Sequence, residues 1–269
     1  MALQHNHTQM KIRKILQECE GIKMFELDGE LEAGAGQFVM ASIPDVSENP
    51  LTVAYDSPLR LIVQARGEDD GEKSFTKTLF GMHTGDSLQI TGPSGNRFAD
   101  IIRPDMGAYF VAGGCGAAAL ELFDKQFSGL GGAYYILGAR SMKYIPVRLL
   151  RMVDGRSTIA TDDGSYGIRG DILAAIESAD IEPGGQAVVC GPRKMMIAAG
   201  DRLSKRMDGN RVVVSLEPYM KCGRGVCGSC EVDGYKACTD GPNFAYSVIS
   251  DAKDFREYNR GKSGAPESL

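Results

Sequence analysis

The apolar positions in the first hundred residues come in short runs that turn residues interrupt. The runs include KIRKIL, QFVMASI, LRLIVQAR and DSLQITG, and Gly, Pro, Asn and Asp separate them. Short apolar or alternating runs bounded by such residues are typical of strands joined by tight turns. The pattern predicts an antiparallel β-barrel over residues 1–102.

The pattern changes near Pro104, where longer apolar strands begin to alternate with helical periods. AYFVAGG is followed by GAAALELFDKQFSG and AYYILGAR, which predict a strand, a glycine turn, a helix and a second strand. RSTIATDD, GDILAAIESA, QAVVCGP, RKMMIAAGDRLSKRM and RVVVSLE continue the alternation. This order predicts an α/β domain over residues 103–216, with a parallel sheet covered by helices.

The strand pattern and the helix pattern of apolar residues both end near Glu217. Residues 218–244 are rich in Gly and Cys, and the polar end KSGAPESL predicts a frayed terminus. A chain of 269 residues is long enough for two domains and a small appendage, so we expect residues 217–269 to form a third segment.

Composition narrows the function. A formal net charge of -5 argues against a nucleic-acid surface, which would need a clustered basic patch, and favours a small-molecule or protein partner. No run approaches the roughly 18 apolar residues that span a bilayer, and the N-terminus lacks the apolar core of a signal peptide. We therefore expect a cytoplasmic protein without a membrane span.

Four of the seven cysteines lie in one short segment with the spacing C-x4-C-x2-C-x7-C. The first three match the plant-type 2Fe–2S pattern C-x4-C-x2-C. Glycines between them permit turns that bring backbone N–H groups toward anionic sulfurs. The spacing predicts a 2Fe–2S cluster that carries single electrons. Its expected ligands are Cys222, Cys227, Cys230 and Cys238.

A zinc site is the alternative for these cysteines. Structural zinc sites usually contain paired C-x2–4-C knuckles, and here only Cys227 and Cys230 form such a pair. A Rieske centre needs two histidines, but His5, His7 and His83 all lie outside this segment. The spacing therefore favours the cluster over zinc and excludes Rieske ligation.

The glycine turn VAGGCGAAAL, residues 111–120, lies where a pyrophosphate could meet backbone N–H groups and a helix N-terminus. It departs from G-x-G-x-x-G because Ala119 replaces the last glycine, so a plain strand-to-helix turn is the alternative. Cys190, after the strand QAVV, is equally consistent with a strand-end thiol and with a place beside a nicotinamide.

In this order, the pieces resemble the iron–sulfur electron-transfer subunits of NAD-dependent dihydroorotate dehydrogenase, in the ferredoxin-reductase-like flavoprotein superfamily. The likeness covers nearly the whole chain and is most specific in SLEPYMKCGRGVCGSC and KACTDGPNF. AGQFVM, GDSLQITGPSGNRF, VAGGCGAAAL, TDDGSYGIRGDI and VVCGPRKMM fill the intervening family positions.

The resemblance implies a role in pyrimidine biosynthesis as an oxidoreductase subunit. It implies a barrel that binds FAD, an α/β domain that receives NAD(H), and a cluster that passes electrons to FMN in a separate catalytic subunit. Two copies of each subunit would form a heterotetramer. A hydride brings two electrons, and a flavin can release them one at a time to a one-electron cluster.

The flavin residues implied by the resemblance depart from the family pattern. The family motif R-P-x-S falls on Asn49, Pro50, Leu51 and Thr52. Neutral Asn49 thus replaces an arginine that binds the FAD phosphate, and Arg66 and Arg60 are the candidates to supply that cation. The family's G-T pair falls on Phe75 and Thr76.

In the α/β domain, the resemblance implies a phosphate turn at residues 113–117, a nicotinamide loop at residues 190–192 and a nearby acidic turn at residues 162–165. Asp163 in the acidic turn could instead be only a cap of that turn. We name no general acid or base, because hydride transfer requires orientation more than proton abstraction. The implied NAD residues are Gly113, Gly114, Gly116, Ala117, Asp163, Cys190, Gly191 and Pro192.

Two other functions compete with this one. Subunits of ferredoxin-dependent NADP reductases or sulfide dehydrogenases resemble this chain but generally carry Asp at the first ligand position, so Cys222 favours dihydroorotate dehydrogenase. The second is a zinc-binding relative that has lost its flavin and its redox activity, which Asn49 and Phe75 suggest.

Overall fold

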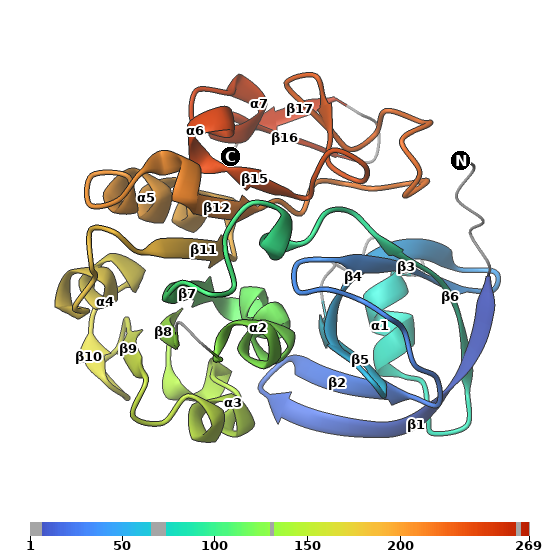
Figure 1. The fold of residues 1–269 in the computed structure, drawn as a ribbon. Coiled ribbons are helices and arrows are strands. Elements are labelled where there is room, and N and C mark those ends of the chain that lie inside the picture. The colour runs from blue at the N-terminus through green and yellow to red at the C-terminus, as the bar shows by residue number, and fades with distance from the viewer. Residues whose placement is uncertain (1–6, 66–73, 130–131, 262–264, 269) are drawn as a thin grey trace.

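The computed structural model describes residues 7–65, 74–129, 132–261 and 265–268. Figure 1 shows a barrel beside an α/β domain, with the C-terminal segment lying across both. Within the described residues, no helix has both the length and the apolar character needed to cross a membrane.

The N-terminal part is a closed antiparallel barrel, as predicted, with the strand order β1-β2-β5-β4-β3-β6. Its interior is filled by apolar side chains such as Phe25, Val39 and Leu61. The helix α1 (Phe75–Phe80), which the pattern did not predict, buries Phe75 and Leu79. The strands are β1 (Thr8–Cys19), β2 (Ile22–Leu27), β3 (Phe38–Ile43), β4 (Ser47–Asp56), β5 (Leu59–Gln64) and β6 (Ser87–Ser94).

The α/β domain contains the predicted parallel sheet, with the order β10-β9-β8-β7-β11-β12-β15. The chain passes from the central strand β7 to β8 on one side and later returns to β11 on the other. The edge of the sheet between β7 and β11 is therefore the switch point at which such folds bind nucleotides. The parallel strands are β7 (Ala108–Gly113), β8 (Ala133–Ala139), β9 (Ser157–Thr161), β10 (Ile168–Arg169), β11 (Gln186–Cys190) and β12 (Val212–Ser215).

The last strand of this sheet comes from the cysteine-rich segment. β15 (Asn243–Ala245) pairs antiparallel with β12, and Phe244 lies opposite Val214. The sequence did not predict this strand, because three residues are too few to show an alternating period. The C-terminal segment is consequently anchored in the sheet.

Helices cover both faces of the sheet. Apolar residues of α2 and α3 pack on one face and those of α4 and α5 on the other. The helix predicted after the glycine turn begins as a 3-10 helix, η2 (Gly114–Ala119), because the N–H of Leu120 bonds to the Ala117 carbonyl, three residues back. The helices are α2 (Leu120–Phe127), α3 (Val147–Met152), α4 (Ile172–Ser178) and α5 (Arg193–Leu203), with short 3-10 turns η1 (Phe98–Asp100), η3 (Met142–Tyr144) and η4 (Gly209–Arg211).

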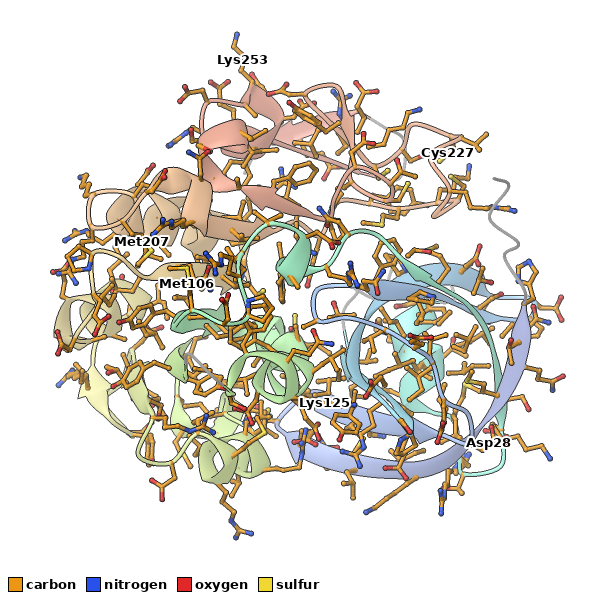
Figure 2. The ribbon with its side chains drawn as sticks, viewed as in Figure 1. Asp28, Met106, Lys125, Met207, Cys227 and Lys253 are labelled. Atoms are coloured by element: carbon orange, nitrogen blue, oxygen red, sulfur yellow. The ribbon has the colours of Figure 1, made fainter. Side chains whose placement is uncertain are left out.

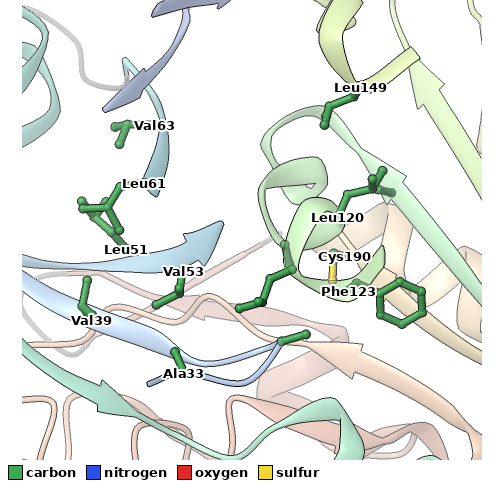
Figure 3. Packing of buried hydrophobic residues seen from close by; sticks show 14 of the residues in the cluster. Ala33, Val39, Leu51, Val53, Leu61, Val63, Leu120, Phe123, Leu149 and Cys190 are labelled. Atoms are coloured by element: carbon green, nitrogen blue, oxygen red, sulfur yellow. The ribbon is translucent and has the colours of Figure 1, made fainter. Parts of the chain in front are cut away.

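One apolar core joins the barrel to the α/β domain. Figure 3 shows Val39, Val53 and Leu61 of the barrel in the same cluster as Leu120 and Phe123 of α2. Burial of a large apolar side chain contributes roughly 1.5–3 kcal/mol. This shared core holds the strands that carry the candidate flavin residues beside the glycine turn.

The C-terminal segment is built from short elements. The sequence predicted a frayed C-terminal end. In the structure, β16 (Tyr258–Arg260) instead pairs antiparallel with β17 (Pro266–Ser268). The Arg193 guanidinium anchors this region by donating to the Tyr258 carbonyl. The other elements are β13 (Glu231–Val232), β14 (Tyr235–Lys236), α6 (Tyr246–Ile249) and α7 (Lys253–Arg256).

Candidate metal centre and cofactor cavity

The four cysteines of the predicted cluster lie within residues 222–238, which include the short strands β13 and β14 and which we call the cysteine loop. The Sγ atoms of Cys230 and Cys238 are 3.3 Å apart and both residues are buried. Cys222 is half-buried and Cys227 is exposed, and Figure 2 shows Cys227 at the edge of the molecule. No three Cys, His, Asp or Glu side chains in the described part of the chain surround a point that one ion could occupy. A 2Fe–2S cluster has two irons that share four ligands, and this donor set fits that requirement.

Backbone N–H groups of the loop point at the sulfurs. The Arg224 N–H donates to Cys222 Sγ (3.4 Å), and the Gly225 N–H donates to Cys238 Sγ (3.1 Å). Gly225 has a φ of +73°, which residues other than glycine rarely adopt. A Cβ at this position would lie 2.8 Å from Thr239 Cγ2. These N–H groups stabilise negative charge on the sulfurs, as an iron–sulfur site requires.

The thiols of this loop differ in acidity. Hydrogen bonds from the Ser229 hydroxyl and N–H, and from Cys222, lower the pKa of the exposed Cys227 to about 6. Burial, followed by the neighbouring Cys230, raises the pKa of Cys238 to about 12. In the metal-free loop Cys227 is therefore a thiolate at neutral pH, whereas Cys238 is a neutral thiol.

We expect iron-free protein to react with iodoacetamide at Cys227 well before Cys238. The thiolate is the reactive form, so the labelling rate of Cys227 rises as the pH increases through about 6 and approaches its maximum at about pH 7. Cys238 stays protonated over this range. Peptide mapping by mass spectrometry measures both sites, and equal labelling of the two at neutral pH would contradict the assigned acidities.

A cavity of about 250 Å³ lies where the barrel, the glycine turn and the segment before Cys222 meet. Barrel residues from the predicted flavin set line it, and these are Asn49, Pro50, Leu51, Thr52 and Thr76. Cys115 and Ala118 of the glycine turn line it as well. Phe75 instead packs in the barrel core, and Arg66 lies outside the described residues.

The described residues that line the cavity include no Lys, Arg or His. Asn49, which the resemblance aligns with the family's arginine, is a neutral residue whose Oδ1 accepts a hydrogen bond from the Ser47 hydroxyl (3.2 Å). The Arg60 guanidinium donates to Glu26 (3.0 Å) and Glu121 (2.6 Å). Arg60 is thus engaged by two carboxylates rather than placed at the cavity wall.

The predicted phosphate turn and nicotinamide loop touch each other at the switch point. A Cβ on Gly116 would lie 2.3 Å from the Cys190 carbonyl oxygen, and one on Gly191 would lie 2.9 Å from the Gly113 carbonyl oxygen. Gly114 has a φ of +58°. Ala117 follows in η2, and Pro192 precedes the first residue of α5. The two loops therefore form one glycine-lined edge beside the cavity.

Cys190 and Asp163 have specific partners. Burial is the main cause that raises the pKa of the Cys190 thiol, and the Glu217 carboxylate raises it further. Asp163 accepts hydrogen bonds from the Ser165 N–H (3.0 Å) and hydroxyl (2.6 Å), which lower the pKa of its carboxyl group. Cys190 is thus a neutral buried thiol, and Asp163 caps the turn after β9.

The sequence interpretation assigned no role to several residues that line the cavity. Glu217, Tyr219 and Met220 follow β12 and lead directly to Cys222. Their signal in the sequence is their place in the segment SLEPYMKCGRGVCGSC, in which the likeness to the family is most specific. They connect the cavity to the cysteine loop along the chain.

The chain is similar to several known proteins. Residues 217–250 match the family described as the iron–sulfur cluster binding domain of dihydroorotate dehydrogenase B. The "Probable dihydroorotate dehydrogenase B (NAD(+)), electron transfer subunit" of Methanocella arvoryzae is 33% identical over 263 residues, covering 96% of this chain and 97% of that protein. The protein of the same name from Pyrococcus horikoshii is 33% identical and covers 97% of this chain and 98% of its own length.

Solved structures agree with this relationship. The structure of an NADH-dependent reduced ferredoxin-NADP oxidoreductase has a TM-score of 0.72 and 28% identity, and covers 89% of this chain and 88% of that chain. The FAD/NAD-binding domain of a nitric oxide dioxygenase from Vibrio cholerae shares the fold, with a TM-score of 0.66, 18% identity and coverage of 78% and 98% of the two chains. The chain belongs to the family of dihydroorotate dehydrogenase B (NAD(+)) electron transfer subunits.

Proposed function

We propose that this chain is the electron-transfer subunit of a dihydroorotate dehydrogenase. It would pass electrons between NAD(H) and a partner subunit that contains FMN, through FAD and a 2Fe–2S cluster. The observation that carries this proposal is a cavity that the barrel residues, the glycine turn and residues 215–220 line together, because residues 215–220 lead to Cys222.

The three parts of the chain would divide the work. Residues 1–102 would bind FAD, residues 103–216 would receive NAD(H), and residues 217–269 would hold the cluster. When bound, FAD supplies the conversion of a two-electron hydride into single electrons for the cluster. The β15 strand keeps the cluster segment attached to the α/β domain.

Individual residues have distinct tasks in this proposal. Thr52 and Thr76 line the cavity, and their hydroxyls would offer hydrogen bonds to FAD. The backbone of Gly113, Gly114, Gly116 and Ala117 would accept the pyrophosphate of NAD(H) at the edge of the sheet. Cys190, Gly191 and Pro192 would flank the nicotinamide, and the neutral Cys190 thiol adds no charge there. Cys222, Cys227, Cys230 and Cys238 would hold the cluster.

The exposed end of the cysteine loop offers a route to the partner subunit. Cys227 is exposed, and the side chain of the neighbouring Val226 is 84% exposed. An apolar residue beside an exposed ligand suits a protein contact through which an electron leaves. We propose a heterotetramer with two copies of each subunit.

Replacing Asn49 with arginine should tighten flavin binding about tenfold. The new cation would restore a charge-assisted hydrogen bond to the FAD phosphate, which contributes about 1.5–3 kcal/mol, and about 1.4 kcal/mol corresponds to tenfold in affinity. Fluorescence titration of the flavin-free protein with FAD measures the dissociation constant. Ser47→Arg, on the same strand but off the cavity wall, is the control, and an equal gain there would contradict the role of position 49.

A second candidate function is electron transfer within another complex. The likeness to a reduced ferredoxin-NADP oxidoreductase at 28% identity favours it, whereas a cysteine at position 222 favours dihydroorotate dehydrogenase. Affinity purification of the full chain from its native cells separates the two. We expect an FMN-containing subunit that oxidises dihydroorotate to co-purify. Recovery of a different oxidoreductase would overturn the first proposal, and a colourless zinc protein would overturn both.

A further inference from the structure

The turn after the fourth cysteine is hydrogen-bonded to the barrel. The Asn96 N–H donates to the Gly241 carbonyl (2.7 Å), and Asn96 Nδ2 donates to the Asn243 carbonyl (2.8 Å). In return, the Asn243 N–H donates to Asn96 Oδ1 (3.1 Å), and Asn243 Nδ2 donates to the Asn96 carbonyl (2.8 Å). We call this reciprocal set the asparagine clamp. It joins the loop after β6 to the segment that carries Cys238.

The asparagine clamp also reaches the wall of the cavity. Asn243 Nδ2 donates a second hydrogen bond to the Gly36 carbonyl (3.1 Å). Gly36 and Pro242 both line the cavity. Gly241, which the clamp holds, lies only three residues after the proposed cluster ligand Cys238. One set of hydrogen bonds therefore connects the cavity wall to the turn that follows the proposed cluster ligand Cys238.

Two glycines allow the barrel and this turn to come so close. A Cβ on Gly95 would lie 2.5 Å from Cδ of Pro242, and a Cβ on Gly36 would lie 2.6 Å from Asn243 Nδ2. Both glycines have positive φ, +79° and +95° respectively. A side chain at either position would push the turn away from the barrel, so the backbone itself is shaped for this contact.

The buried Asn243 side chain is explained by its two N–H donors. Asn243 is 1% exposed, and its Oδ1 has no hydrogen-bond partner among the described residues. A buried acceptor without a partner destabilises a fold, so an apolar residue would suit this position better if packing were its only task. The two N–H donors, which hold Gly36 and Asn96, are the feature that only this side chain supplies.

We infer that Asn96 and Asn243 are positioning residues for electron transfer, because they fix the separation between the flavin cavity and the cluster. The inference rests on the proposed function. Each transfer moves one electron from the flavin to the cluster and leaves the bonds of both asparagines unchanged. The rate of such a transfer falls exponentially with separation, so a link that keeps the two sites from drifting apart sustains it.

The test uses Asn243→Asp in the full chain loaded with flavin and cluster. The variant keeps the size of the side chain but loses both N–H donors. After mixing with NADH, flavin reduction should proceed at the wild-type rate, while the later reduction of the cluster should slow about tenfold or more. Hydrogen exchange, an independent readout, should accelerate at Gly36 and at residues 241–243.

Two further variants keep the test decisive. Tyr246→Phe removes a partly buried hydrogen bond to Asp201 (2.6 Å) in the same segment but away from the barrel. It should lower the melting temperature without slowing cluster reduction. If Asn243→Asp does not fold, Asn96→Ala takes its place as the test. Asn96 is less buried than Asn243, and its variant should slow the reduction of the cluster in the same way.

The results of these experiments distinguish a failure of the proposed function from a failure of the role proposed for the asparagine clamp. Wild-type protein that binds no flavin or no cluster would overturn the proposed function. Wild-type protein that reduces its cluster with NADH, alongside folded variants that do so at the same rate, would overturn only the role of the asparagine clamp.

Discussion

Replacing Cys227 with serine removes the electron paramagnetic resonance signal of the cluster after reduction with dithionite. Serine lacks the thiolate that binds iron, and Cys227 is exposed, so the substitution costs little packing. Even residues that only support metal ligands contribute about 10- to 100-fold to metal affinity or activity. We therefore expect electron transfer beyond the flavin to fall by more than about a hundredfold, while NADH still reduces the flavin.

The matched control is Cys19→Ser. Cys19 is a half-buried cysteine at the end of β1 and lies outside the cysteine loop. Its variant should keep the full signal and the full iron content. If Cys227→Ser retained the wild-type signal, the ligand assignment would be wrong.

Substituting alanine for Gly116 should lower the rate of flavin reduction by NADH about a hundredfold. The added Cβ would lie 2.3 Å from the Cys190 carbonyl oxygen, so the phosphate turn and the nicotinamide loop must move apart. Overpacking of this kind costs about 1–3 kcal/mol, and a misplacement of about 1 Å can cost roughly a hundredfold in rate. Single-turnover absorbance of the flavin after mixing with NADH measures the effect.

Gly184→Ala is the control for Gly116→Ala. A Cβ at Gly184 would meet no atom within 4 Å, and its φ is not among the positive values of the chain. The cluster signal after dithionite should persist in both variants, because neither touches the cysteine loop. Wild-type hydride transfer in Gly116→Ala would show that the contact between the two loops does not position the nicotinamide.

The fold was largely predictable because its strands carry strong local patterns. Val188 and Val213 belong to continuous apolar runs that are buried on both faces, as parallel strands require. Short alternating runs with turn residues between them likewise predicted the barrel. The sequence did not predict β15, because three residues are too few to show an alternating pattern. The pairing of Phe244 with Val214 exists only in the folded chain.

The site was predictable where its residues are close in sequence. Cysteine spacing alone indicated the four candidate ligands, since one loop supplies them all. Glu217 at the cavity and the pair Asn96 and Asn243 were not predictable, because their roles depend on contacts between distant segments. Asn96 and Asn243 are 147 residues apart, and no short motif records such a contact.

The central claim is that electrons from NADH reach the cluster through this chain alone. Rapid freeze-quench electron paramagnetic resonance of the purified full chain, loaded with FAD and iron–sulfur cluster and mixed with NADH, tests it most directly. We predict the signal of a reduced 2Fe–2S cluster that grows after the flavin has been reduced. Flavin reduction without any cluster signal, in protein whose cluster dithionite can reduce, would contradict the account.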